Sequence, residues 1–263
     1  MNNDMYIDTH CHLNFPDFDG DRDEVVKEAE RQGVAGVVNI GTGIETSRES
    51  IEISNRYGIV YPTAGIHPTD VENLAFSDMK LIENLAKNEK VRGIGETGLD
   101  FYYGRSFEEK QKDFFSAHIE IAGKLNLPLV IHQRESRDEV IDIIEKGVMP
   151  EKVVFHCFGG DAELAEYCRK KGFYISFTGI ITFKKADDVK EVCRKYPLEL
   201  IMAETDAPFL APVPYRGKRN DPSKVRYVVE AIANVKGMGI KECAERIFLN
   251  SREFFNLGST LDT

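Results

Sequence analysis

Short runs of apolar and β-branched residues alternate along the chain with amphipathic segments of helical period. The apolar runs have the length of single strands and occupy residues 5–12, 34–41, 59–66, 91–96, 128–132, 152–157, 173–178 and 199–206. The helix-favouring segments are residues 21–32, 46–57, 77–88, 107–125, 136–146, 161–171 and 187–195, and two more, 222–236 and 240–256, follow the eighth run. Eight strand–helix units without a linker predict one α/β domain over residues 1–263, folded as a (β/α)8 TIM-like barrel.

Several of these segments begin or end with residues that favour helix boundaries. Ser77, Ser136 and Asp161 are expected as N-caps, and Gly33 and Gly172 follow helix ends, where a left-handed residue is favoured. A doubly wound open sheet is the main alternative to the barrel. That sheet does not need eight strands, and it would not gather the ends of five separate strands around one centre, as a closed barrel does.

The first apolar run ends in two histidines that are one residue apart. Alternate residues of a strand face the same side, so His10 and His12 can both reach one metal ion. This spacing alone is a weak signal. It gains weight because ligand-type residues end four other predicted strands, at the functional face of such a barrel: Glu96, His132, His156 and Asp206. Together these residues predict a metal site at the C-terminal ends of the strands.

The ordinary alternative for His132 or His156, taken singly, is a histidine whose hydrogen bonds are satisfied within the core. That explanation does not suit the whole set, because unrelated core residues would not all lie at the C-terminal ends of their predicted strands. His118 is different, since it lies with Phe114 on the apolar stripe of a helix and is expected to pack there. His67 ends the third strand, and we expect it to contact substrate or phosphate rather than a metal.

Two carboxylates lie deeper along the strands that carry the candidate ligands. Glu204 shares the parity of Asp206 one layer below it. It either accepts the free ring N–H of a ligand histidine or bonds a nearby backbone group or hydroxyl, and the sequence leaves both alternatives open. Asp8 has the parity of His10 and is expected to support the site or the fold rather than to bind a metal directly.

The formal net charge of −10 limits how the chain can hold nucleic acid. Extended duplex binding is disfavoured because counterion release rewards a basic surface, so a phosphate must be held locally by metals and a few cations. Five scattered cysteines without C-x-x-C spacing indicate reduced thiols in a cytoplasmic protein. We expect no secretory signal and no membrane-spanning helix, because the N-terminus lacks a basic segment before an apolar stretch and the apolar runs are short.

Seven sequence blocks that contain these residues resemble the signature blocks of TatD-family metal-dependent hydrolases. They are, in family order, Asp8-Thr9-His10-Cys11-His12, Gly65-Ile66-His67-Pro68, Gly95-Glu96-Thr97-Gly98-Leu99-Asp100, Ile131-His132-Gln133-Arg134, His156-Cys157-Phe158 with Gly160, Glu204-Thr205-Asp206-Ala207-Pro208, and the segment from Pro214 to Pro222. Each block is only moderately specific, but together they are a strong signal over nearly the whole chain. The resemblance implies a TIM-like barrel, two divalent metal ions and phosphodiesterase activity on DNA, often as a 3′-to-5′ exonuclease.

The resemblance also implies a role for each matched residue. One metal ion would be surrounded by His10, His12, Glu96 and Asp206. The second would be surrounded by Glu96, His132 and His156, so that Glu96 bridges the pair, and Asp206 would orient or deprotonate the attacking water. Imidazole ligands favour zinc, nickel, cobalt or manganese, while magnesium, which prefers oxygen ligands, can still support activity as a replacement.

Cations close to these blocks are candidate phosphate contacts. Arg134 has the parity of His132, and Arg216 and Lys218 lie in a proline-rich loop after the eighth strand, for which a solvated rim is the alternative. The cations favour a DNA hydrolase that grips a single strand or a strand end. The acidic charge favours the competing hypothesis, a hydrolase of a small ester, amide or lactone on the same metals. A non-enzymatic metal scaffold is disfavoured because structural sites are usually rich in cysteine. The sequence does not indicate the oligomeric state.

Overall fold

The computed structural model describes residues 5–258 of the chain. Within them each predicted apolar run overlaps one strand, namely β1 (Tyr6–Cys11), β2 (Val34–Asn39), β3 (Val60–Ala64), β4 (Gly93–Asp100), β5 (Leu129–Arg134), β6 (Val153–Phe155), β7 (Tyr174–Phe177) and β8 (Ile201–Ala203). The strands follow one another in the sheet in sequence order. Strand β4 extends four residues beyond the predicted run, which ended at residue 96.

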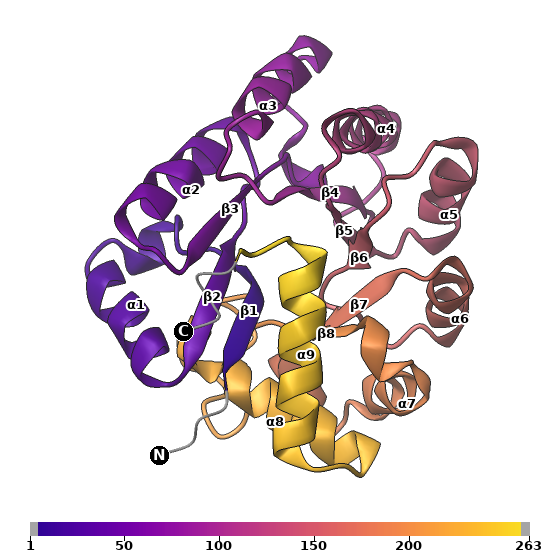
Figure 1. Ribbon diagram of the computed structural model, residues 1–263. Helices are drawn as coiled ribbons and strands as arrows, with labels where there is room; N and C mark the ends of the chain where they lie inside the picture. Colours follow the sequence, from indigo (N-terminus) through magenta and orange to yellow (C-terminus); the bar gives the residue numbers. More distant parts are fainter. Residues whose placement is uncertain (1–4, 259–263) are drawn as a thin grey trace. The chain divides into compact units, whose positions relative to one another are not determined.

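Helices alternate with the strands along the chain, as the colours of Figure 1 show. In the described residues they are α1 (Arg22–Arg31), α2 (Ile44–Arg56), α3 (Met79–Ala86), α4 (Glu108–Leu125), α5 (Arg137–Lys146), α6 (Ala162–Lys171), α7 (Asp187–Lys195), α8 (Val225–Lys236) and α9 (Ile240–Phe254). Short 3-10 turns occupy Pro16–Phe18, Pro68–Asp70, Phe76–Asp78, Gly179–Thr182, Leu198–Leu200 and Pro222–Lys224. None of the helices described is long and apolar enough to cross a membrane.

The first and last strands of the sheet are neighbours. Cys11, at the end of β1, pairs in parallel with Ala207, four residues beyond β8. Strands β1 and β2 pair in parallel, and so do β7 and β8, with Ile175 opposite Ile201. A sheet whose eight strands run in sequence order and whose ends meet is a (β/α)8 barrel, which confirms the predicted fold class over the doubly wound alternative.

The Cα positions divide the chain into two compact units, each assembled from separate segments. One unit contains β1, β2, β7 and β8 with α1 and α6 to α9, and the other, made of Ile40–Arg56 and Tyr61–His156, contains most of β3, all of β4 to β6, and α2 to α5. In the second unit β3 to β6 pair in parallel, with Ile94 opposite Leu129 and Leu129 opposite Val153. The expectation of one domain over residues 1–263 stays a prediction.

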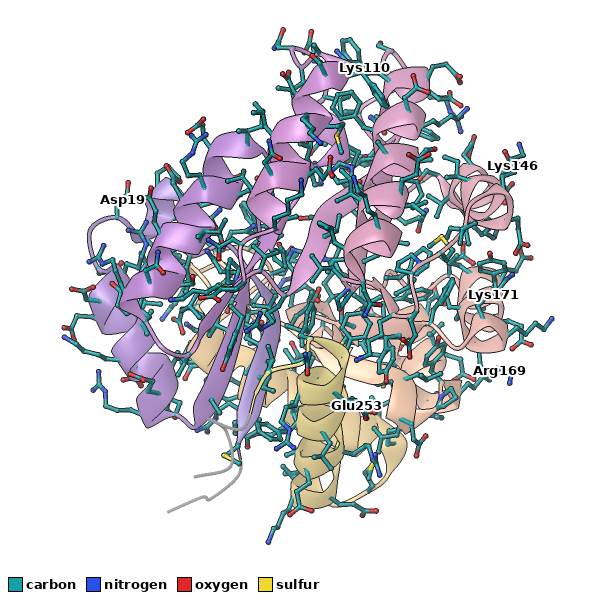
Figure 2. The ribbon with its side chains drawn as sticks, turned by 45° about the horizontal axis from the view of Figure 1, so that its top comes forward. Asp19, Lys110, Lys146, Arg169, Lys171 and Glu253 are labelled. Atoms are coloured by element: carbon teal, nitrogen blue, oxygen red, sulfur yellow. The ribbon has the colours of Figure 1, made fainter. Side chains whose placement is uncertain are left out.

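Helices pack through apolar stripes that the sequence pattern predicts. The buried side chains of α8 include Val225, Val228, Val229 and Ile232, which recur three and four residues apart and so lie on one face of the helix. Charged side chains occupy the opposite faces: in Figure 2, Lys146 of α5 and Lys171 of α6 extend away from the ribbon. One face of α8 is therefore buried in the protein, whereas charged side chains of α5 and α6 meet solvent.

The helix boundaries follow the predicted caps only in part. Asp161 caps α6, since its carboxylate accepts the N–H groups of Glu163 and Leu164 at 3.0 Å, and Gly172 ends that helix with a φ of 71°. Ser136 is the N-cap residue of α5, as predicted, but its hydroxyl donates to the carbonyl of Leu99 at 2.8 Å instead of accepting an N–H of the helix. The prediction for Ser77 was wrong, because it lies inside the 3-10 turn that precedes α3.

Candidate metal centre

Three candidate ligands of the first unit converge in what we call the His-x-His cluster, formed by His10, His12 and Asp206. The Nε2 atoms of the two histidines are 3.3 Å apart. Oδ1 of Asp206 lies 3.3 Å from Nε2 of His12 and 3.8 Å from Nε2 of His10. The strand alternation that predicted a shared face for the two histidines is therefore observed, and Asp206, three residues beyond β8, joins them.

The pairing between β1 and the segment after β8 holds this cluster together. The N–H of Asp206 donates to the carbonyl of His10, and the N–H of His12 donates to the carbonyl of Ala207, both at 2.8 Å. Asp206 has a φ of 54°, a left-handed conformation that aspartate and asparagine adopt more readily than most residues. Its side chain is 15% exposed, whereas that of His10 is fully buried, so Asp206 is the member of the cluster that water reaches.

Asp8 supports the cluster from one layer below, as the sequence predicts. One of its oxygens accepts the N–H of Thr205 at 2.8 Å, and the other accepts the Thr205 hydroxyl at 2.5 Å. Burial raises the pKa of the Asp8 carboxyl well above its ordinary value, and the two bonds from Thr205 oppose that rise. Because Thr205 directly precedes Asp206, these bonds set the backbone from which the Asp206 side chain projects.

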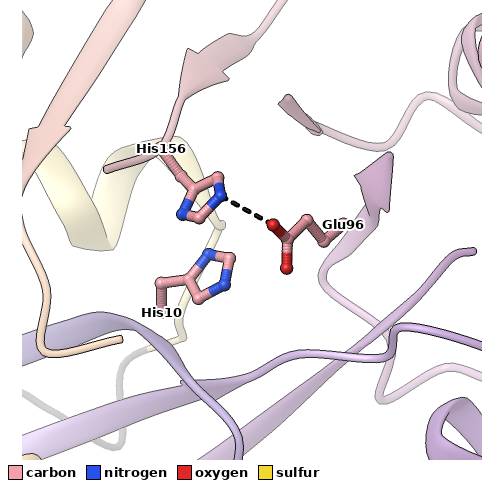
Figure 3. Close-up of side chains that lie close together, drawn as sticks. All are labelled: His10, Glu96 and His156. Atoms are coloured by element: carbon pink, nitrogen blue, oxygen red, sulfur yellow. Dashed lines mark ion pairs between the residues drawn. The ribbon is translucent and has the colours of Figure 1, made fainter. Parts of the chain in front are cut away.

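The second unit contains what we call the Glu96 cluster, formed by Glu96, His132 and His156. Oε1 of Glu96 lies 2.9 Å from Nδ1 of His132 and 2.7 Å from Nε2 of His156, and these two nitrogens are 3.2 Å apart. Figure 3 shows the ring of His156 directed at the Glu96 carboxylate. Glu96 within β4, His132 within β5 and the residue after β6 thus bring three of the predicted ligands to one point.

Sequence reasoning assigned no role to Asp100, which orients the ring of His132. Oδ2 of Asp100 lies 2.9 Å from Nε2 of His132. Burial alone would lower the pKa of His132, but the bonds to Asp100 and Glu96 outweigh it and raise that pKa. Burial alone would likewise raise the pKa of Asp100, and the bond to His132 lowers it overall. Asp100 is therefore a carboxylate that accepts the Nε2–H of His132 and leaves Nδ1 to face Glu96.

The geometry of both clusters fits a divalent cation. With Nε2 of His132 protonated, the lone pairs of Nδ1, of Glu96 Oε1 and of His156 Nε2 meet at 2.7–3.2 Å, which is repulsive unless a proton or a cation lies among them. Ligand atoms about 2.1 Å from a metal ion lie about 3.0–3.4 Å apart in octahedral or tetrahedral geometry. The ligand atoms of each cluster have separations close to this range, and the predominance of imidazole suits zinc, manganese, nickel or cobalt.

Glycine is required where β4 passes β5 beside the cluster. Gly98 has a φ of 135°, and a Cβ atom at this position would lie 2.0 Å from the carbonyl oxygen of His132. Any side chain there would force the two strands apart at the histidine. The Gly-Glu-Thr-Gly block therefore allows the close strand approach that brings Glu96 to His132.

His67 lies beside the Glu96 cluster, with its Nε2 atom 3.5 Å from Oε1 of Glu96. Its Nδ1 atom accepts the N–H of Thr69 at 3.2 Å, so in the neutral ring the proton is on Nε2. Burial lowers the pKa of His67 to about 4, which keeps the ring neutral near pH 7. A ring that presents an N–H is a hydrogen-bond donor, which agrees with the expected substrate contact better than with a metal ligand.

Glu204 bonds a backbone N–H and a hydroxyl, which is the second of the two alternatives that the sequence left open. Its Oε1 accepts the N–H of Cys157 at 2.8 Å, and its Oε2 accepts the hydroxyl of Ser176. Cys157 follows His156 in the chain and has a φ of 46°. Through this bond Glu204 fixes the backbone immediately after a candidate ligand.

Two predicted phosphate contacts have exposed side chains that stack on aromatic rings. The guanidinium of Arg134 lies 3.4 Å from the centre of the Tyr102 ring, and that of Arg216 lies 4.4 Å from the centre of the Phe183 ring. Lys218 is exposed in the same loop as Arg216. Arg219 differs, because both of its terminal nitrogens pair with the carboxylate of Asp21, which lowers the pKa of that carboxyl.

Known proteins resemble this chain over nearly its full length. The TatD related DNase model matches residues 7–256. YabD of Bacillus subtilis (strain 168), an uncharacterised metal-dependent hydrolase, is 39% identical over 254 residues, which cover 96% of this chain and all of YabD. YcfH of Escherichia coli (strain K12), with the same description, is 35% identical over 97% of both chains.

Solved structures show the same fold. The crystal structure of YjjV, a TatD homologue from Escherichia coli K12, matches with a TM-score of 0.91 at 27% identity and covers 96% of this chain and 98% of YjjV. A TatD family hydrolase from Entamoeba histolytica matches with a TM-score of 0.84 at 23% identity, over 96% of this chain and 98% of that protein. The family model, the relatives and the fold agree, and the chain belongs to the TatD family of metal-dependent hydrolases.

Proposed function

We propose that this protein is a divalent-metal-dependent deoxyribonuclease that removes nucleotides from a DNA strand in the 3′-to-5′ direction. The observation that supports it most is the presence of two clusters of imidazole and carboxylate side chains, each with separations close to those of the ligands of one divalent ion. The name of the matching family model, TatD related DNase, supports the choice of DNA as substrate.

Two divalent ions, one held by His10, His12 and Asp206 and the other by Glu96, His132 and His156, would activate a water molecule and stabilise charge on the entering and leaving oxygens. The two carboxylates contribute −2 to this set, and the imidazoles are neutral ligands. A pair of ions with a total charge of +4 therefore leaves a positive excess toward a phosphate, even though the chain has a net charge of −10.

Asp206 would accept the proton of the attacking water. It is a carboxylate at the end of a strand pairing, it is the water-accessible member of its cluster, and Thr205 and Asp8 fix its backbone. Its pairing with His12 at 3.3 Å keeps one oxygen at the ligand position. The other oxygen is then the proton acceptor in this proposal.

Neutral and cationic donors would bind the phosphate itself. The Nε2–H of His67, which lies beside Glu96, would donate to a phosphate oxygen. Arg134 and Arg216 are held by stacking on aromatic rings, which leaves the edges of their guanidinium groups for charge-assisted hydrogen bonds. Lys218 adds a further exposed cation in the loop after β8.

The second candidate is hydrolysis of a small ester, amide or lactone at the same ligands. The net charge of −10 favours it, because an acidic protein gains little from a long polyanion. Fold and ligands do not distinguish the two, since one metal centre on this fold can act on different substrates.

A single assay separates the two candidates. The purified protein, with added manganese or zinc, is incubated with single-stranded DNA labelled at either end and, in parallel, with an uncharged aryl ester. We expect DNA cleavage that starts at the 3′ end and stops in EDTA. Ester hydrolysis with intact DNA under the same conditions would establish the second candidate instead.

A further inference from the structure

The loop between β4 and α4 exposes aromatic rings beside the Glu96 cluster. Tyr102 is 51% exposed, Tyr103 is 77% exposed and Phe107 is 38% exposed. Exposed tyrosine rings that lie together offer flat apolar faces to solvent, and grouped rings of this kind are common where a protein binds a ligand. Metal binding does not explain why these rings are exposed, since neither cluster contains a tyrosine or phenylalanine.

The two tyrosines and Arg134 form one stacked group. The guanidinium of Arg134 lies 3.4 Å from the centre of the Tyr102 ring and 5.6 Å from that of Tyr103. The two rings meet edge to face, with centres 5.0 Å apart and planes at 88°. Arg134 therefore fixes the ring of Tyr102 by a cation–π contact, and Tyr102 in turn supports the more exposed ring of Tyr103.

Backbone hydrogen bonds tie this loop to the Glu96 cluster. The N–H of Tyr102 donates to Oδ1 of Asp100 at 2.9 Å, while Oδ2 of the same carboxylate lies 2.9 Å from Nε2 of His132. The N–H of Phe101 donates to the carbonyl of Arg134, and the N–H of Gly104 donates to the carbonyl of Phe101, both at 3.0 Å. One carboxylate thus orients a candidate metal ligand and the start of the aromatic loop.

We propose that Tyr103, supported by Tyr102, is a stacking platform for an unpaired nucleobase of the strand whose phosphate is bound beside Glu96. Aromatic stacking accepts every base, because each base has a π face. It also supplies affinity without positive charge, which suits a chain with a net charge of −10. A base inside a duplex is already stacked and paired, so the platform selects single strands and frayed ends. The proposal rests on the proposed action on DNA and specifies which form of DNA is bound.

The test measures binding, so that it gives an answer whether or not the strand is cut. Every variant carries Asp206→Asn, and its affinity for a fluorescein-labelled single-stranded oligonucleotide is measured by anisotropy with manganese present. Tyr103→Ala removes the ring, and Tyr103→Phe keeps it. Val148→Ala is the matched control, since this side chain is 89% exposed in the loop before β6.

We expect Tyr103→Ala to weaken binding on the order of tenfold, and Tyr103→Phe and Val148→Ala to bind like the parent. An oligonucleotide with one abasic residue at successive positions from the 3′ end identifies the stacked base. At that position the abasic residue should weaken the parent as much as Tyr103→Ala does and should cause no further loss in Tyr103→Ala. Duplex DNA of the same sequence with blunt ends should bind more weakly than the single strand.

The outcomes separate this inference from the proposed function. Equal binding by Tyr103→Ala and the parent, while the enzyme with Asp206 intact still cuts DNA, would overturn the platform and leave the nuclease proposal standing. A loss in Tyr103→Phe as large as that in Tyr103→Ala would overturn stacking in favour of a hydroxyl contact. Absence of both binding and cleavage of DNA would overturn both proposals.

Discussion

The Nε2 atom of His132 lies 2.9 Å from the carboxylate of Asp100, which is itself a buried residue at the end of β4. This contact sets which nitrogen of the ring faces Glu96, and so which nitrogen is available to a metal ion. A carboxylate in this position also makes the imidazole a better ligand, because it stabilises the proton on the far nitrogen.

Replacing Asp100 should therefore weaken metal binding without removing a ligand. We expect Asp100→Ala to lose roughly 10- to 100-fold in metal affinity at the Glu96 cluster, the range typical for an outer partner of a ligand histidine. Competition with a chromophoric chelator measures the affinity. The control is Asp113→Asn, at an exposed position of α4, which should bind metal like the parent. Unchanged affinity in Asp100→Ala would mean that Asp100 does not support a metal ligand.

The metal content of the protein tests the ligand assignment directly. We expect up to two divalent ions per chain by elemental analysis, and loss of hydrolysis in EDTA that is reversed by added metal. His12→Ala and His156→Ala should each lose about one ion, since each removes a ligand from one of the two clusters. Full activity of metal-free protein in chelator would exclude this site as the reaction centre.

Asp206→Asn should separate catalysis from folding. Asparagine tolerates the left-handed φ of 54° and keeps one ligand oxygen, so the fold and most of the metal binding should be retained. Turnover should fall by roughly two orders of magnitude or more, because the proton acceptor is lost. Turnover, metal content and the melting temperature are measured together. Parent-like turnover in this variant would exclude Asp206 as the base.

The arginine contacts test the substrate class. Arg134→Ala and Arg216→Ala should slow DNA hydrolysis much more than hydrolysis of an uncharged ester, because each change deletes a charge-assisted contact with phosphate. The loss should be larger at low salt, where screening is weak. Arg219→Ala is the control, since that guanidinium is already paired with Asp21. If Arg134→Ala and Arg216→Ala cut DNA like the parent, hydrolysis of a small molecule would be the better proposal.

The buried ring of His118 predicts how stability depends on pH. Nδ1 bonds the carbonyl of Phe114 at 2.7 Å, and Nε2 accepts the N–H of Ile66 at 3.0 Å, so the folded protein holds the ring neutral. Burial lowers the pKa of His118 from 6.5 to about 4. The unfolded chain takes up a proton below pH 6.5 and the folded chain does not, so this contribution to stability is complete above pH 6.5 and is lost as the pH falls toward 4. The loss amounts to at most roughly 3 kcal/mol.

Urea unfolding of the metal-free protein measures this dependence. His118→Gln keeps an acceptor for the N–H of Ile66 but does not titrate. Between pH 6.5 and pH 4 the free energy of unfolding of the variant should fall less steeply than that of the parent, by up to about 1.4 kcal/mol per pH unit for one proton. Identical slopes would show that His118 does not control acid stability.

The fold and the candidate ligands were predictable because each depends on a local pattern. The strands are short runs that are largely buried, and alternation along a run predicts which side chains share a face. The end of β4 was not predictable in this way, since Glu96 to Asp100 contains Gly98 and three polar residues, and pairing with β5 sustains the strand. Asp100 was overlooked for that reason.

The local sequence pattern also did not predict contacts between side chains that are distant in the chain. Arg219 lies in the same loop after β8 as Arg216 and Lys218, but it pairs with Asp21, which lies 198 positions earlier in the chain. Glu204 was ambiguous because its choice between a ring N–H and the N–H of Cys157 depends on how the backbone turns after β6. His118, by contrast, was correctly predicted as a packed helix residue, because the helical stripe alone determines its burial.

The bonds that pair β1 with the segment after β8 also carry three candidate ligands, since the N–H of Asp206 donates to His10 and the N–H of His12 donates to Ala207. Metal binding at this cluster should therefore stabilise the pairing of the two segments, and the pairing should in turn strengthen metal binding. Each tenfold excess of free ion over its dissociation constant should add about 1.4 kcal/mol to the work of separating these segments. Deuterium exchange at the backbone amides of His12 and Asp206 should therefore slow when metal is added. This exchange would report metal binding without any substrate.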